Sequence, residues 1–366
     1  MRRNKPRARA VILSFAFVAL TACAKPPGLQ STALQLQPTL QDQFPSSTDM
    51  ILVRGNERIR SQVDTGSVYL FVGGHPEDPN LTCPSKPTFY YGAGFAEFCP
   101  ATAPLKALGA DNSVVEVAPN LKYGDANFKN WVGPHSIIGV SGNMEGENLP
   151  GVETVIDQLR PDHMSFQFPN GGQNSAIVEF AALPPEKLRG VAAVPLVSPG
   201  SLKYGYTANI SRVDFMVDSR IRASIVSEAG GVFLERDGQR SRIAEKNLAF
   251  FDTGATLPFT PLNGDISLLS NQVAKAPIPF TGTEAYDKVQ FTLDVGNGDH
   301  VVLVNDNVKA WGAPPEPPFF TLPAASDFPP GLVQFTSVVG LGTLSLYDFQ
   351  FTFKDGRATS ASFVSH

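Results

Sequence analysis

Short apolar stretches separated by turn residues run along most of the chain. Ile51-Leu52-Val53 is apolar, and two of its three residues are β-branched. The pair Gly55-Asn56 that follows is typical of a tight turn, and residues 57–63 return as a second strand. The pattern predicts a β-hairpin that leads directly into the triplet Asp64-Thr65-Gly66.

The same plan occurs again in the second half of the sequence. Residues 232–235 form an apolar stretch, Asp237-Gly238 is a turn pair, and residues 239–251 lead into a second triplet, Asp252-Thr253-Gly254. Each triplet comes at the end of a hydrophobic strand and is followed by another apolar stretch. Two such units indicate an internal duplication.

A later apolar segment extends the repeat in each half. Ile137-Ile138-Gly139 follows the first triplet, and Val338-Val339-Gly340 follows the second. Both have two β-branched residues before a glycine, so the two halves look like copies of one ancestral unit. The alternative is a duplicated β-protein in which the triplets are only turns, because Asp and Gly are common turn residues.

Composition agrees with this β pattern. The 366 residues are 42% hydrophobic and only 17% charged, with 26 Phe, 32 Gly and 31 Pro. A low charged fraction with many turn residues predicts a mainly β globular protein rather than one of long, salt-bridged helices. The formal net charge of −5 argues against nucleic acid as a partner.

The N-terminus has the features of an export signal. Residues 2–9 are basic and residues 10–20 are apolar, which is too short a run to span a bilayer as a helix. The segment ends in Leu20-Thr21-Ala22-Cys23, which resembles the bacterial lipobox. The resemblance implies a signal peptide of residues 1–22, fatty acylation (palmitate) of Cys23, and a lipid anchor in a bacterial membrane. Ala24, the residue after this cysteine, implies that the anchored protein is sorted to the outer membrane or its periplasmic face.

Residues 23–47 are rich in Pro, Gln and Ser, and we expect them to form a flexible tether after the lipidated cysteine. Only Cys83 and Cys99 then remain. An even pair in an exported protein predicts a disulfide, which stabilises a fold by about 3 kcal/mol for a loop of this size. Stabilisation alone is a sufficient reason for such a bond.

From residue 48 to the C-terminus, the two triplets and their apolar-apolar-Gly segments resemble the pepsin-like aspartic peptidases. The resemblance implies a bilobal β fold, with one lobe in residues 48–190, the other in 191–366, and the active-site cleft between them. It also implies an aspartic endopeptidase, active as a monomer on peptides or unfolded proteins and without a cofactor. Asp64 and Asp252 are then the catalytic pair.

The chemistry of such a pair explains the residue types around it. Two carboxyl groups that share one proton can activate a water molecule and polarise a peptide carbonyl, because like charges at this distance cannot both ionise. Supporting residues implied on the two loops are Thr65, Gly66, Ser67, Thr253 and Gly254. Ala255 stands where the family usually has a hydroxyl residue, which we expect to move the pH optimum toward neutrality.

Pepsin-like enzymes also close their cleft with a hairpin that carries a tyrosine. Tyr91-Gly92-Ala93-Gly94 fits this flap, and the expected disulfide would clasp the base of the hairpin. Tyr123 is a competing candidate, although it leaves little chain before residue 137. Phe71 stands where many members have a tryptophan that hydrogen-bonds the flap tyrosine, so that bond is not expected here.

Other classes have less support in the sequence. The five histidines are scattered, so no metal site is expected, and there is no serine-nucleophile or phosphate-loop motif. A catalytically silent pepsin-fold lipoprotein that binds peptides or a partner protein is the main alternative. A surface lipoprotein with a structural role is the weaker one.

Overall fold

The computed structural model describes the chain in segments. These are residues 33–41, 44–73, 83, 86–91, 94–129, 136–141, 149–169, 176–197, 206–263, 286–306, 308, 325, 328 and 331–366. The signal peptide and the lipidation site expected at Cys23 lie outside these residues. No helix in the described segments is long and apolar enough to cross a membrane.

The described residues are 66% strand, which confirms the expected mainly β class. The first of two large sheets has the order β11-β22-β21-β9-β10-β1-β2-β3-β8-β4-β7-β6-β5. Its strands are β1 (Ala33–Gln41), β2 (Phe44–Arg54), β3 (Glu57–Asp64), β4 (Leu70–Val72), β5 (Thr88–Tyr91), β6 (Gly94–Leu108), β7 (Val114–Lys129), β8 (Ser136–Gly139), β9 (His163–Gln167), β10 (Ala176–Glu179), β11 (Ala193–Pro195), β21 (Tyr347–Lys354) and β22 (Arg357–Ser365).

The second sheet carries most of the remaining chain. Its main path is β15-β14-β13-β12-β16-β20-β17, with β18 paired to both β12 and β19. Its strands are β12 (Thr207–Val217), β13 (Arg220–Glu228), β14 (Gly231–Arg236), β15 (Gln239–Ala244), β16 (Lys246–Asp252), β17 (Phe259–Asn263), β18 (Lys288–Gly296), β19 (Asp299–Asn305) and β20 (Gln334–Gly340). Two short helices, α1 (Val155–Leu159) and α2 (Leu341–Leu344), complete the described elements.

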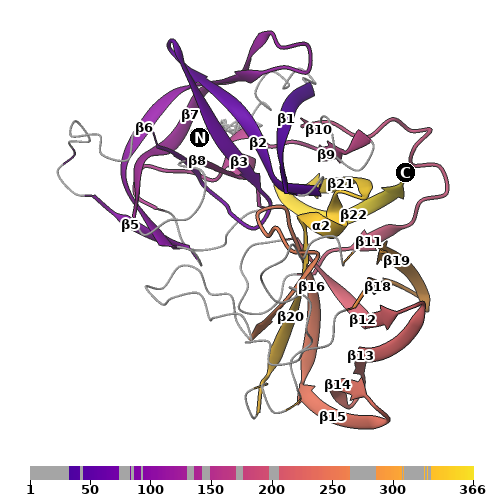
Figure 1. The fold of residues 1–366 in the computed structure, drawn as a ribbon. Coiled ribbons are helices and arrows are strands. Elements are labelled where there is room, and N and C mark those ends of the chain that lie inside the picture. Colours follow the sequence, from indigo (N-terminus) through magenta and orange to yellow (C-terminus); the bar gives the residue numbers. More distant parts are fainter. Residues whose placement is uncertain are drawn as a thin grey trace, which may run out of the picture.

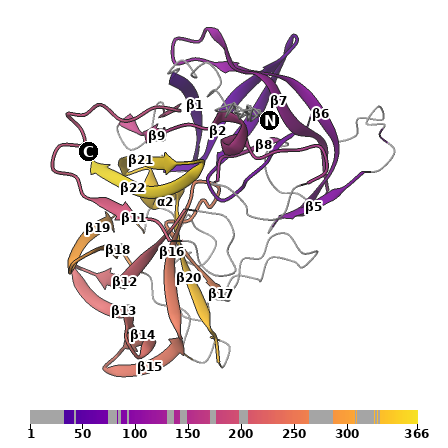
Figure 2. The same ribbon diagram turned by 180° about the vertical axis from the view of Figure 1, so that it is seen from behind.

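Strands from both ends of the sequence meet in the first sheet. β9 pairs with β21, and β22 pairs with β11, so the C-terminal strands extend a sheet that begins with β1. Figures 1 and 2 show β21 and β22, in yellow, between the indigo and magenta strands above and β12–β20 below. The two sheets therefore do not divide the chain into an N-terminal and a C-terminal part.

The expected tether is shorter than the sequence suggested. Residues 33–41 form β1, which pairs with β2 on one side and with β10 on the other. Leu34 and Leu36 are buried and alternate with Gln35 and Gln37, which is the period of two that a half-buried strand requires. The prediction of a tether through residue 47 is thus wrong from Ala33 onward.

Both predicted hairpins are present. β2 and β3 join at Gly55-Asn56, and β14 and β15 join at Asp237-Gly238. Gly55, Asp237 and Gly238 have φ values of 60°, 51° and 72°, the left-handed conformation that such turns need. One detail differs: the single run expected over residues 239–251 breaks at Glu245, because β15 pairs with β14 whereas β16 pairs with β12 and β20.

Candidate active site

The two Asp-Thr-Gly triplets occupy equivalent places in the two sheets. β3 runs parallel to β8, with Asp64 opposite Gly139, and β16 runs parallel to β20, with Asp252 opposite Gly340. In each case the apolar-apolar-Gly strand lies between the strand before the triplet and the strand after it, β4 or β17. The repeat seen in the sequence is therefore a repeat of structure, and the register between the aspartate strand and the Gly strand is the same in both units.

Glycine is needed where the middle strand of each unit ends. A Cβ on Gly139 would lie 2.5 Å from the backbone nitrogen of Val68, and one on Gly340 would lie 1.9 Å from the carbonyl oxygen of Leu257. Both contacts are with backbone atoms, which cannot rotate away. The loop after each aspartate therefore crosses directly over a glycine of the neighbouring strand.

Two threonines join the aspartate loops to each other. The Thr65 hydroxyl donates to the carbonyl oxygen of Phe251 (2.9 Å) and accepts from the backbone N–H of Thr253 (2.9 Å). The Thr253 hydroxyl donates to the carbonyl oxygen of Val63 (2.9 Å) and accepts from the N–H of Thr65 (3.1 Å). Both threonines are fully buried, so this symmetric set of four bonds is shielded from water.

The glycine of each triplet faces the aspartate of the other. A Cβ on Gly66 would lie 2.5 Å from Oδ1 of Asp252, and a Cβ on Gly254 would lie 2.5 Å from Cγ of Asp64. Neither glycine has a positive φ, so the requirement is for space rather than for an unusual backbone conformation. The absence of these two side chains lets the carboxyl groups come together.

The two carboxyl groups have different hydrogen-bond partners. Asp64 accepts the N–H of Gly66 on Oδ1 (2.7 Å) and the hydroxyl of Ser67 on Oδ2 (2.5 Å). Asp252 accepts the N–H groups of Gly254 (2.8 Å) and Ala255 (3.2 Å), both on Oδ1. Ala255 has no hydroxyl to offer, so the second loop lacks the counterpart of the Ser67 bond.

The surroundings of Asp252 favour its protonated form. Burial raises the pKa of Asp252 well above its ordinary value of 3.8, and the negative charge of Asp64 and a hydrogen bond to Asp64 raise it further. The N–H groups of Gly254 and Ala255 act in the opposite direction without cancelling the shift. The pair therefore retains one shared proton to higher pH than an isolated aspartate would.

Two further residues, neither of them among the expected site residues, connect the aspartate loops. Tyr206 is fully buried and stacks on Phe351, its hydroxyl donates to the carbonyl oxygen of Val140, and its own carbonyl oxygen accepts the N–H of Phe251. Gln62 donates from Nε2 to the carbonyl oxygen of Gly254 (3.4 Å). A polar residue next to the end of an apolar strand was the only available signal for Gln62.

The expected flap residues lie on the β5–β6 hairpin. Tyr91 ends β5 and pairs with Gly94 at the start of β6, while Gly92 and Ala93 lie outside the described residues. The competing candidate, Tyr123, lies inside β7 opposite Ala101 and is buried, so it does not occupy a hairpin tip.

Aromatic contacts pack the base of this hairpin against Phe71, the residue that stands where many pepsin-like enzymes have a tryptophan. Phe71 is fully buried, with ring centroids 5.5 Å from Phe89 of β5 and 5.0 Å from Phe98 of β6. Tyr69 meets Phe89 edge-on at 5.7 Å. Apolar packing thus links the strand that follows Asp64 to both strands of the hairpin.

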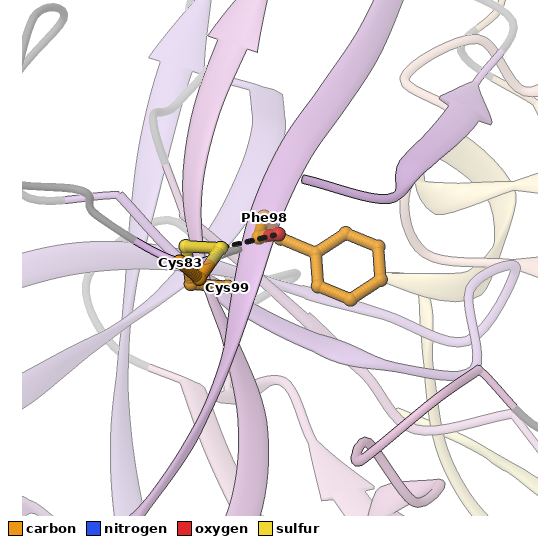
Figure 3. Close-up of a disulfide and its surroundings, with 3 residues drawn as sticks. All are labelled: Cys83, Phe98 and Cys99. Atoms are coloured by element: carbon orange, nitrogen blue, oxygen red, sulfur yellow. Dashed lines mark hydrogen bonds between the residues drawn. A yellow bond between two sulfur atoms is a disulfide. The ribbon is translucent and has the colours of Figure 1, made fainter. Parts of the chain in front are cut away.

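The expected disulfide is confirmed and lies at the open end of the same hairpin. Cys83 and Cys99 are bonded with an S–S distance of 2.08 Å, and Cys99 is within β6 (Figure 3). The sulfur of Cys83 lies 4.0 Å from the carbonyl oxygen of Phe98. The bond therefore fixes the chain that enters β5 to the neighbouring strand.

Within the described residues, no group of three or more His, Cys, Asp or Glu side chains is placed to hold a metal ion. No protein-family model matches the sequence, and no curated protein matches it significantly. The interpretation of this site therefore depends on its own geometry.

Proposed function

We propose that the protein is an aspartic endopeptidase of pepsin-like, bilobal architecture, in which Asp64 and Asp252 together activate a water molecule that attacks a peptide bond. The observation that carries the proposal is the pair of carboxyl groups itself. Two duplicated loops present them to each other, the triplet glycines leave them room, and paired threonine bonds hold the loops together. A purely structural turn has no need to hold two mutually repelling acids against each other.

In the proposed reaction the shared proton divides the two roles. The ionised carboxyl removes a proton from water, while the protonated one donates a hydrogen bond to the carbonyl oxygen of the substrate. The raised pKa of Asp252 supports a pair that holds one proton in the free enzyme, and this proton belongs to the pair as a whole. Breakdown of the tetrahedral intermediate then requires a proton on the leaving nitrogen, which the same pair supplies.

The substrate in this proposal is a peptide or an unfolded protein segment, which lies as an extended strand in a cleft under the β5–β6 hairpin. Exposed backbone N–H and C=O groups of a hairpin can pair with such a strand. Export of a lipid-anchored monomer completes the proposal. The Cys83–Cys99 disulfide supports the export, because such bonds persist in oxidising compartments.

The test is hydrolysis of a denatured protein by the purified chain, started at Ala24 so that β1 is retained. Asp64→Asn and Asp252→Asn preserve side-chain shape but cannot share a proton, so each should reduce kcat by about a thousandfold or more. Asp299→Asn, at an exposed position in β19, is the matched control and should keep full activity.

A statine-type transition-state analogue should inhibit the parent enzyme. Full activity of both aspartate variants would overturn the proposal. Tight binding of unfolded peptides without cleavage by the parent chain would instead identify a silent, peptide-binding protein.

A further inference from the structure

A second polar site lies on the outer face of the sheet formed by β12–β15, on elements that do not carry the aspartate pair. Register places four residues side by side across these strands: Asp214 opposite Ser224, Ser224 opposite Glu235, and Glu235 opposite Arg240. Directly paired residues point to the same face of a sheet. Next to them is a hollow open to solvent, which we call the arginine hollow. It is lined in part by Arg212, Arg222, Ser224, Glu235, Arg236 and Arg240.

A buried carboxylate fixes one of these arginines. Asp214 is 4% exposed and Ser224 is 1% exposed. Arg212 donates from Nε to Oδ1 of Asp214 (2.6 Å) and from Nη2 to the hydroxyl of Ser224 (2.8 Å), and that hydroxyl donates to the same Asp214 oxygen (2.6 Å). Burial of a carboxylate is costly, so this network indicates a guanidinium whose orientation matters. Only two of its five N–H donors are used by these bonds.

Arg222 supplies positive charge that no acid in the described segments neutralises. It is exposed on β13, two residues before Ser224, and has no ion pair or hydrogen bond with the residues that the structure describes. Arg240, in contrast, is paired with Glu228 (2.6 Å) and Glu235 (3.6 Å) and lies 4.0 Å over the ring of Phe233. The acids near the hollow are thus paired with arginines other than Arg222.

Arg222 is the one arginine of the hollow that has no acidic partner in the part of the chain that the structure describes. The other three arginines of the lining are paired, Arg212 with Asp214, Arg236 with Asp237, and Arg240 with Glu228 and Glu235. A guanidinium fork held in a fixed orientation, beside a second arginine without a partner, suits an oxyanion that accepts hydrogen bonds from several directions. A phosphate group has this geometry and a charge near −2 at neutral pH.

We propose that the arginine hollow binds a phosphate group, with Arg212 as the oriented donor and Arg222 as the principal charge. The phosphate belongs either to a soluble phosphorylated ligand or to a lipid headgroup, since the chemistry is the same in both cases. The site is independent of the aspartate pair, so the proposal does not depend on peptidase activity.

Calorimetric titration with pyrophosphate, at ionic strength held constant with chloride, tests the proposal. The parent protein should bind with saturation, and Arg222→Ala should weaken binding by about tenfold or more, since it removes the unpaired guanidinium and its charged hydrogen bonds. Arg222 is exposed, so this variant should fold normally. Arg222→Lys keeps the charge but loses the fork, and should be intermediate.

Arg58→Ala, which removes an exposed arginine of β3, is the control for net charge and should bind like the parent. Absence of saturable binding, or equal weakening by Arg58→Ala and Arg222→Ala, would refute the site. Sedimentation with phosphatidylcholine vesicles, with and without phosphatidic acid, separates the two sources. Arg222-dependent binding to the acidic vesicles assigns a lipid headgroup, and pyrophosphate binding alone assigns a soluble ligand.

Discussion

The hydroxyl of Tyr206 donates a hydrogen bond to the carbonyl oxygen of Val140, and the N–H of Val140 donates to the carbonyl oxygen of Asp64 (2.9 Å). Because the carbonyl oxygen of Tyr206 also accepts the N–H of Phe251, this single residue bridges the two aspartate loops. Burial raises the pKa of Tyr206 well above its ordinary value, so the hydroxyl remains a donor across the useful pH range.

Tyr206→Phe should therefore act on the aspartate pair as well as on stability. Loss of a buried bond, with an acceptor left unsatisfied, should lower the free energy of unfolding by about 1–3 kcal/mol. The kcat for peptide hydrolysis should fall and its pH profile should move, with little change in KM. Tyr347→Phe is a matched control, because its hydroxyl bonds the backbone of Val304 on a different strand pair. A pH profile altered equally in both variants would show that Tyr206 has only a structural role.

Gly66→Ala should disable the site without unfolding the protein. The added methyl group would lie 2.5 Å from Oδ1 of Asp252, so that carboxyl must move. Misplacement of a reacting group by about 1 Å costs roughly a hundredfold in rate. Gly230→Ala, whose methyl group would meet only Phe233 at 3.7 Å, should leave activity unchanged. Circular dichroism would establish that both variants are folded, and an active Gly66→Ala enzyme would contradict the close approach of the two loops.

The raised pKa of Asp252 should also make stability depend on pH. A carboxyl whose pKa is higher in the folded state than in the unfolded state binds its proton more strongly when folded, so the free energy of unfolding falls as pH rises above the ordinary value of 3.8. Asp252→Asn removes this loss and should be more stable than the parent near pH 7, by urea denaturation. The difference should shrink toward about pH 4. A parent protein whose stability rises relative to the variant over this interval would contradict the direction of the shift.

Ala255→Ser tests the difference between the two loops. A hydroxyl placed as Ser67 is beside Asp64 would donate to Asp252, favour its ionised form and lower its pKa. The activity profile should therefore move to lower pH, and the loss of stability as pH rises above 3.8 should be smaller than in the parent. Ser67→Ala should shift the activity profile the other way. Unchanged profiles in both variants would mean that these hydroxyls do not set the titration of the pair.

Removal of the disulfide should affect the β5–β6 hairpin more than the rest of the protein. On the chain-entropy model, loss of a link between residues 16 apart lowers the free energy of unfolding by about 3 kcal/mol. The double variant Cys83→Ser, Cys99→Ser should lose protection of β5 amides in hydrogen exchange while β16 and β20 remain protected. Uniform loss of protection in both sheets would show that the bond stabilises the whole fold instead.

The features that the sequence predicts well are those with local causes. Gly55-Asn56 and Asp237-Gly238 adopt left-handed turns that few other residues tolerate, so both hairpins could be read directly from the chain. The proximity of Asp64 and Asp252 could be inferred because the same hairpin and Asp-Thr-Gly pattern surrounds each of them in the sequence. The disulfide followed from the number of cysteines.

Other features depend on contacts between distant residues. β1 has only Leu34 and Leu36 to mark it as a strand, and its Pro- and Gln-rich surroundings concealed it. Tyr206 is separated by 66 residues from the carbonyl group that it bonds, and nothing in its local sequence indicates that bond. The pairing of β9 with β21 is equally invisible to short-range patterns.

That last pairing has a consequence for biosynthesis. β9 can pair with its neighbour β21 only after residues 347–354 have been synthesised. The carboxylate of Asp348, which accepts the backbone N–H of Phe168 (2.9 Å), is present only from that point on. A chain emerging from a ribosome or a translocation pore therefore carries β9 with an open edge until almost the whole polypeptide is available. Because such edges invite pairing between nascent chains, this topology makes a holding chaperone most useful late in synthesis, when nearly all of the protein is already exposed.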